Sequence, residues 1–84
     1  MGISVVELSA LAQSARCTDD ELIVTLVDGR TIAAPIIWFP TLAKATPAQR
    51  TRVELLGQGE GLHWPDLDED ISVAGLLRGT RPTA

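Results

Sequence analysis

The segment 59–70, GEGLHWPDLDED, combines the side chains best suited to chemistry in this chain. It holds the only histidine of the sequence, His63, together with five carboxylates. An imidazole beside carboxylates can act as a general base or bind a divalent cation. One hypothesis is therefore a small enzyme or metal-dependent factor that uses His63 with Asp66 and Asp68. In that hypothesis His63 is the candidate catalytic residue.

The spacing of the carboxylates does not support a calcium loop. Asp66, Asp68 and Asp70 have the 1-3-5 spacing of an EF-hand, but that loop also needs glycine at position 6 and glutamate at position 12. Ile71 and Leu77 occupy those positions. A transition-metal site needs several converging ligands, and the chain has one histidine and one cysteine. We therefore expect no metal and no cofactor.

A structural role for the same residues is the competing interpretation. His63 can hydrogen-bond to the backbone or to a carboxylate and so hold the turn that follows it, while Asp70 caps the last helix. The glycines of 57–61, GQGEG, follow a predicted helix instead of opening one, and no Lys-Ser/Thr pair follows them. This segment is therefore neither a dinucleotide fingerprint nor a phosphate-binding loop.

Composition restricts the classes of partner. The chain has 84 residues, 45% hydrophobic and 21% charged, with a net charge of −4. An acidic domain repels nucleic acid, although Lys44, Arg50 and Arg52 form a small basic patch. The sequence contains no membrane span and no export signal, which together with the lone Cys17 predicts a cytoplasmic protein without an internal disulfide.

The strongest structural signal is a β-hairpin. The β-prone runs 22–27 and 30–36 flank Asp28-Gly29, the typical sequence of a two-residue type I′ loop. This loop predicts a register in which Val24 faces Ala33. Both faces of the hairpin would then be apolar, one with Leu22, Val24 and Leu26, the other with Ile23, Val27 and Ile32. Because so short a chain can cover only one face, we expect the other to be buried in a homodimer or against a partner protein.

Helix signals lie on both sides of the candidate site. Thr46, Pro47 and Gln49 form a capping box that opens a helix expected to reach Leu56 and to end at Gly57, with an Arg50–Glu54 pair on its exposed side. Asp70 or Ser72 is expected to cap a last helix over 73–78. The predicted fold class is α+β: a small antiparallel sheet of about three strands, packed against two or three short helices. Residues 1–79 form one domain, in which 1–12 is an arm or a helix, and 80–84 is a mobile tail.

Three aromatic residues complete the set of candidate binding residues. Trp38, Phe39 and Trp64 are expected to anchor the core, and any that is exposed would mark an interface. The candidate binding residues are therefore Trp38, Phe39, Arg50, Arg52, His63, Trp64, Asp66, Asp68, Glu69 and Asp70.

The chain resembles a family of small bacterial proteins that is catalogued only as a domain of unknown function. The resemblance covers residues 20–79 and follows the pattern D-G-R, W-[FY]-P-x-L and G-x-G-[IL]-H-W-P-x-L-D-E-D-I-S, with Thr41 where the family has arginine. It implies a compact α+β domain, often encoded beside another small protein in suspected toxin–antitoxin pairs. It brings no activity, substrate or cofactor.

These observations favour a protein-interaction domain, the antitoxin-like or regulatory half of a two-protein bacterial module. The expected partner is a second copy of the chain or a small basic protein, met through the apolar sheet face and the acidic rim 66–70. Direct binding to nucleic acid or membrane is disfavoured.

Overall fold

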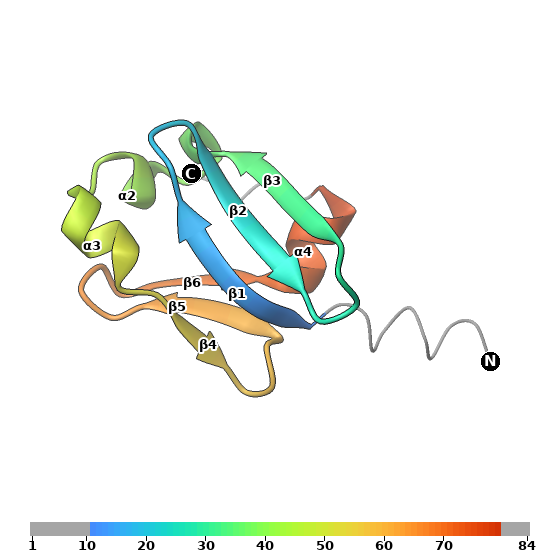
Figure 1. Cartoon of the computed structure of the whole chain (residues 1–84). Coiled ribbons are helices and arrows are strands. Elements are labelled where there is room, and N and C mark those ends of the chain that lie inside the picture. The colour runs from blue at the N-terminus through green and yellow to red at the C-terminus, as the bar shows by residue number, and fades with distance from the viewer. Residues whose placement is uncertain (1–10, 80–84) are drawn as a thin grey trace.

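The computed structural model describes residues 11–79, which form two small antiparallel sheets and several short helices (Figure 1). Sheet A contains β1 (Ala12–Cys17), β2 (Glu21–Leu26) and β3 (Thr31–Pro35) in the order β1-β2-β3. Sheet B contains β4 (Glu54–Leu56), β5 (Gly61–Trp64) and β6 (Glu69–Ser72) in the order β4-β5-β6. The predicted α+β class is confirmed, with two sheets in place of one.

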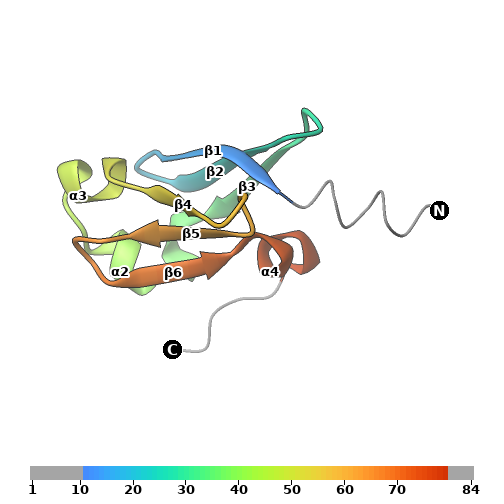
Figure 2. The same cartoon turned by 90° about the horizontal axis from the view of Figure 1, so that it is seen from below.

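Short helices close the two ends of the sheet pair. The 3-10 helix η1 (Ile36–Trp38) leads into α2 (Pro40–Ala43) and α3 (Pro47–Thr51), and α4 (Val73–Arg78) follows β6. In two perpendicular views, α2 and α3 lie at one end of the sheets and α4 at the other (Figures 1 and 2). No helix within residues 11–79 is long and apolar enough to cross a membrane.

The core lies between the two sheets and unites residues of both. On β2 and β5, alternate side chains turn inward and are fully buried, among them Leu22, Val24, Leu62 and Trp64. The same cluster contains Ala12, Leu26, Ala34, Ile36, Phe39, Leu42, Ile71, Val73 and Leu76. Each sheet therefore has one face in the core and one outer face.

The β2–β3 connection has three residues, so the predicted two-residue loop is wrong. Leu26 N–H donates to Arg30 O at 2.8 Å, and Gly29 has a φ of 95°. A three-residue loop with glycine in the left-handed region is the next most common hairpin connection, and it too can contain Asp-Gly. The Asp28 carboxylate stabilises it by accepting from Arg30 N–H at 3.0 Å and pairing with the guanidinium at 2.7 Å.

The corrected register moves Ile32 to the core face. Val24 faces Ile32, and Ile23 faces Ala33. The outer face of sheet A then carries mainly small and polar residues, namely Ser14, Arg16, Thr25, Thr31 and Ala33, together with the half-buried Ile23, and Val27, directly after β2, is 53% exposed. The expected hairpin with two apolar faces is wrong, because a shift of one residue exchanges the two faces. Of the three apolar residues expected on the second face, Ile32 turns to the core while Ile23 and Val27 do not, so the apolar surface for a homodimer is smaller than expected.

The segment after Thr46 differs most from its prediction. The capping box is confirmed: Thr46 Oγ1 accepts from Gln49 N–H, and the Gln49 side chain accepts from Thr46 N–H. The helix ends at Thr51 instead of Leu56, and 54–56 forms β4 against β5. The predicted Arg50–Glu54 pair on a helix face is therefore wrong.

Both predicted boundaries of the last helix are confirmed. The last helix, predicted over 73–78, is α4 (Val73–Arg78), and Gly79 ends it with a φ of 75°. Of the uncertain segment 1–12, Ala12 begins β1 and is buried, whereas residues 1–10 lie outside the described range, as does the expected tail 80–84.

Candidate functional site

The outer face of sheet B forms from two rows of side chains across its three strands. The first row joins Glu54, His63 and Asp70, which face one another in register, and the second joins Leu56, Gly61 and Ser72. Leu62, Trp64 and Ile71 alternate with them and point into the core. Strand alternation therefore gathers a histidine, two carboxylates, a leucine and a serine on one exposed surface.

His63 makes its contact with the carboxylate directly opposite on β6. His63 Nδ1 lies 2.5 Å from Asp70 Oδ1, and 26% of the His63 side chain is exposed. The hydrogen bond to Asp70 raises the pKa of His63; burial opposes this, and the charges of Asp70, Glu54 and Asp68 add to the increase. The predicted hydrogen bond from His63 to a carboxylate is thus confirmed.

Asp70 does not cap the last helix, so that expectation is wrong. Ser72 is the N-cap of α4, and its Oγ accepts from Gly75 N–H at 3.1 Å. Ser72 was the named alternative. Asp70 lies two residues before Ser72 on β6, so its side chain is on the outer face of sheet B.

A shallow hollow of about 450 Å³ lies beside this row. Its floor is Gly61, where an added Cβ would lie 3.2 Å from Leu56 Cδ1. Leu56, 40% exposed, is an apolar residue of its lining, and Glu60 and Asp70 are its acidic lining residues. Gly57, Ile71 and Ser72 complete the lining. The hollow can receive an apolar or amphipathic side chain that carries a positive end.

The charges of the chain are strongly segregated toward sheet B. Residues 53–72 contain six carboxylates and neither lysine nor arginine, a formal charge of −6 with His63 neutral. The whole chain has a net charge of −4, so the remaining residues carry −4 − (−6) = +2. Sheet B and its turns therefore form a negatively charged surface on a chain whose other parts are weakly positive.

The other acidic candidates are arranged differently from the predicted site. Asp66 pairs with Arg52, the guanidinium Nε lying 3.5 Å from Asp66 Oδ2. Asp68 lies in the turn between β5 and β6 with a φ of 51°, and Glu69 is half-buried opposite Trp64. Within residues 11–79, no group of three or more His, Cys, Asp or Glu side chains is arranged to hold a metal ion.

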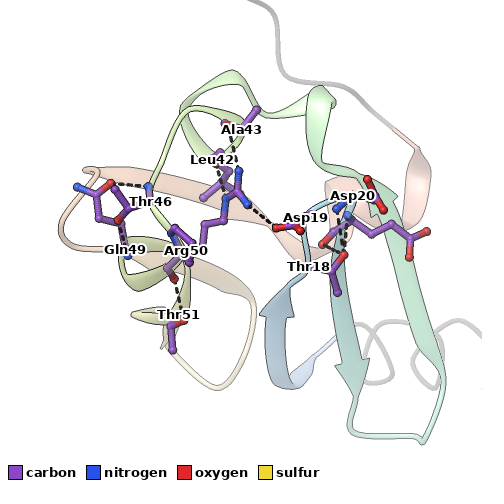
Figure 3. Close-up of polar contacts among 11 residues, drawn as sticks. Thr18, Asp19, Asp20, Leu42, Ala43, Thr46, Gln49, Arg50 and Thr51 are labelled. Atoms are coloured by element: carbon purple, nitrogen blue, oxygen red, sulfur yellow. Dashed lines mark hydrogen bonds and ion pairs between the residues drawn. The ribbon is translucent and has the colours of Figure 1, made fainter.

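Arg50 has an internal role and is not part of an exposed basic patch (Figure 3). Its side chain is 13% exposed and donates to Leu42 O at 2.8 Å and to Ala43 O at 2.9 Å, the carbonyls at the end of α2. It also reaches Asp19 in the β1–β2 turn at 3.8 Å. Its own carbonyl accepts from Trp64 Nε1–H at 3.0 Å. Arg50 therefore joins the helical end of the molecule to both sheets.

The aromatic candidates lie in or against the core. Phe39 and Trp64 are buried, with 1% and 0% exposure, and contact other parts of the same chain. Trp38 is half-buried against the core. Lys44 is exposed on the turn after α2, apart from sheet B.

Sequence reasoning missed the β4 part of the surface. Glu54, Leu56, Glu60 and Gly61 were assigned to a helix and a loop, yet they provide one end of the charged row and most of the hollow. The available signal was the pair of β-compatible segments 53–56 and 61–64 on either side of a glycine-rich four-residue connection, which is typical of a hairpin.

Comparisons with known proteins place this geometry among uncharacterised relatives. Residues 12–82 match the model of a family described as "Protein of unknown function (DUF2442)". A crystal structure of a protein of unknown function from Rhodospirillum rubrum has a TM-score of 0.77 and 41% identity, covering 87% of this chain and 90% of that one. A solution NMR structure of an uncharacterized protein from Chromobacterium violaceum has a TM-score of 0.76 and 27% identity, covering 99% of this chain and 77% of that one. No curated protein matches the chain.

Proposed function

Because the chain belongs to the DUF2442 family of proteins of unknown function, and this membership assigns no activity, we propose from its geometry that it is a protein-interaction domain. It binds a positively charged partner protein through the outer face of sheet B. The finer form of the proposal is an antitoxin-like or regulatory half of a two-protein module, in which the acidic surface covers a basic surface of the partner.

A single observation carries the proposal: an apolar hollow and exposed leucines lie within the most acidic part of the chain. Leu56 on the outer face is 40% exposed, Leu55 at the same edge is 42% exposed on the opposite face, and residues 53–72 contain six carboxylates without a lysine or arginine. Exposed apolar surface rimmed by charge is typical of a binding site, and complementary charge accelerates and selects the encounter. A basic partner fits both features.

The row Glu54–His63–Asp70 adds selectivity for cations. Asp70 holds the imidazole in place, and Glu54 lies opposite on the edge strand. A lysine or arginine of the partner can form charge-assisted hydrogen bonds with the carboxylates of this row. The alternative that uses His63 with Asp66 and Asp68 gains less support, since Asp66 is paired with Arg52 and His63 with Asp70.

Co-purification with the product of the neighbouring gene tests the proposal. The test variant is Glu54→Gln, Glu60→Gln and Asp68→Asn, which removes three negative charges from sheet B and its turns. The control is Asp19→Asn, Asp20→Asn and Glu21→Gln, which removes three from the exposed β1–β2 turn. We expect the wild type and the control to retain the partner at low salt, and the sheet B variant to lose it.

The salt dependence of binding and the comparison of the two triple variants separate this proposal from its alternatives. Binding through complementary charge weakens as the salt concentration rises, because exposed charges are screened within about 10 Å at 0.1 M. Failure of the wild type to retain the partner, or equal loss in both triple variants, would refute binding through sheet B.

A further inference from the structure

β4 is an open edge of sheet B within the described residues. It pairs with β5 on one side, and its one other backbone bond there is the turn contact from Gly59 N–H to Leu56 O at 3.0 Å. All three residues of β4 are exposed, and Figure 1 shows the strand at the margin of the molecule. An unpaired strand edge presents N–H and C=O groups that can pair with another chain.

The other three sheet edges carry features that oppose such pairing. β1 has an irregular register between Ala12 and Ser14, β3 ends in Pro35, and β6 carries the adjacent carboxylates Glu69 and Asp70. Bulges, prolines and charges are the usual means by which proteins protect strand edges. β4, with the sequence Glu-Leu-Leu, has a single charge and two exposed leucines. Among these four edge strands, β4 is the one with exposed leucines, and its length of three residues means that an added strand would form a short ladder.

The side chains of β4 define what an added strand should carry. The residue opposite Glu54 extends the row that contains His63 and Asp70, so a lysine or arginine is favoured there. The residue opposite Leu56 continues the row that borders the hollow, and the residue opposite Leu55 covers a leucine on the other face. Apolar residues are favoured at both positions.

Charge decides between a partner protein and a second copy of this chain. Pairing β4 with the β4 of another copy would bring together two copies of the exposed Glu54, and residues 53–72 of each copy contain six carboxylates with one neighbouring cation, Arg52, which pairs with Asp66. Like charges at close range oppose such contact, whereas a basic strand meets opposite charge. We propose that an extended basic segment of a partner protein adds to β4 as the fourth strand of sheet B. This inference rests on the proposed function and specifies its binding mode.

Two synthetic peptides test strand addition without a known partner. The first is Lys-Thr-Lys-Val-Val-Lys-Thr-Lys, which reads the same in both directions and so offers the favoured pattern to β4 in either orientation. The second is identical except that both valine nitrogens are methylated. Because successive amides of a strand point to opposite sides, one of the two methyl groups must then point toward β4.

We expect the first peptide to bind, measured by fluorescence anisotropy, and to slow amide hydrogen exchange at residues 54–56. The methylated peptide has the same charge but loses backbone hydrogen bonds, so it should bind roughly tenfold more weakly or worse. Leu56→Ser should weaken binding of the first peptide. Leu77→Ser, which changes another exposed leucine on α4, should leave it unchanged.

Three results would overturn strand addition. Equal binding of both peptides, with unprotected β4 amides, would mean contact through charge alone and would leave the proposed function intact. A second result is that the first peptide does not bind although the neighbouring gene product is still retained through the sheet B carboxylates. This result would refute the binding mode and leave the proposed function intact. Protected β4 amides in a dimer of the free protein would assign the edge to a second copy.

Discussion

At the scale of single residues, Arg50 shows how a charged side chain can be committed to the fold. Its guanidinium donates to two carbonyls at the end of α2, those of Ala43 and of Leu42, the second of which also accepts from Ala45 N–H. Its fixed, planar set of donors suits this geometry better than an ammonium group. The contact with Asp19 adds little, since that carboxylate is 96% exposed and such ion pairs contribute weakly.

Replacement of Arg50 by lysine should therefore lower the free energy of unfolding. Loss of hydrogen bonds to two carbonyls predicts a decrease of about 1–3 kcal/mol. The measurement is urea denaturation followed by tryptophan fluorescence. Arg52→Lys is the matched control, because its side chain is 69% exposed and its pairing with Asp66 is long at 3.5 Å. A change as small as that of the control would mean that the α2 carbonyls do not depend on Arg50.

His63 links the outer face of sheet B to pH. Its pKa is raised above 6.5, first by the hydrogen bond to Asp70. A histidine with a raised folded-state pKa stabilises the fold fully below its unfolded pKa, and that contribution disappears as the pH rises through the folded-state pKa. Asp70→Asn should lower the pKa of His63, as measured by NMR titration of the imidazole.

The difference in the free energy of unfolding between wild type and Asp70→Asn should also decrease as the pH rises. It should be largest just below the unfolded-state histidine pKa of about 6.5, where the imidazole is protonated, and should shrink as the pH rises through the higher folded-state pKa of His63. Ser72→Ala removes the helix cap on the same strand and serves as the control, with an effect that changes little across this range. An unchanged His63 pKa in Asp70→Asn would contradict the role given to the pair.

At the scale of elements, the turn between β4 and β5 depends on close contact with β1. Gly59 is buried with a φ of 110°, and Ala12 N–H donates to its carbonyl at 2.8 Å. A Cβ on Gly59 would overlap the carbonyl oxygen of Ala12. This contact joins the two sheets and sets the position of the turn at the rim of the hollow.

Gly59→Ala should therefore destabilise the protein by about 3 kcal/mol or more, through backbone strain together with overlap. Gly29→Ala is the matched control: it has a φ of 95° and no atom within 4 Å of an added Cβ, so it should cost only about 1–2 kcal/mol. Thermal denaturation of the two variants measures the difference. Equal destabilisation by the two substitutions would show that Ala12 can move away from the added Cβ without a loss of stability.

The elements that sequence could predict are those with a local cause. The capping box at Thr46, the glycine that ends α4 and the strand on either side of Asp28-Gly29 all follow from their own residues. β4 could not be assigned in this way, because Glu-Leu-Leu also suits a helix. Its pairing with β5 is what makes this segment a strand. The register of β2 and β3 failed for a similar reason: Asp-Gly is compatible with loops of two and three residues.

The candidate site was half predictable for the same physical reason. A carboxylate partner for His63 followed from composition, but the choice of Asp70 depends on the four-residue turn that places β6 opposite β5. Glu54 and Leu56 joined the site only through the strand pairing that sequence did not reveal. Local chemistry was therefore visible in the sequence, whereas its assembly across strands was not.

At the scale of the whole molecule, the two outer faces differ in what they can bind. The outer face of sheet A carries Arg16, Thr25 and Thr31 around a half-buried Ile23 and offers little continuous apolar surface. The outer face of sheet B has apolar surface but repels a copy of itself through its carboxylates. Self-association through either face is thus opposed, by polarity in one case and by charge in the other.

We accordingly expect the protein to sediment as a monomer at low ionic strength. The triple variant Glu54→Gln, Glu60→Gln and Asp68→Asn should associate more strongly than the wild type. It keeps the exposed leucines of β4 but loses much of the charge repulsion between two copies. The variant of the β1–β2 turn, with Asp19→Asn, Asp20→Asn and Glu21→Gln, reaches the same net charge and should stay monomeric. Sedimentation equilibrium distinguishes these cases. A wild-type dimer at low salt, or equal association of the two variants, would show that the placement of charge on sheet B does not control assembly.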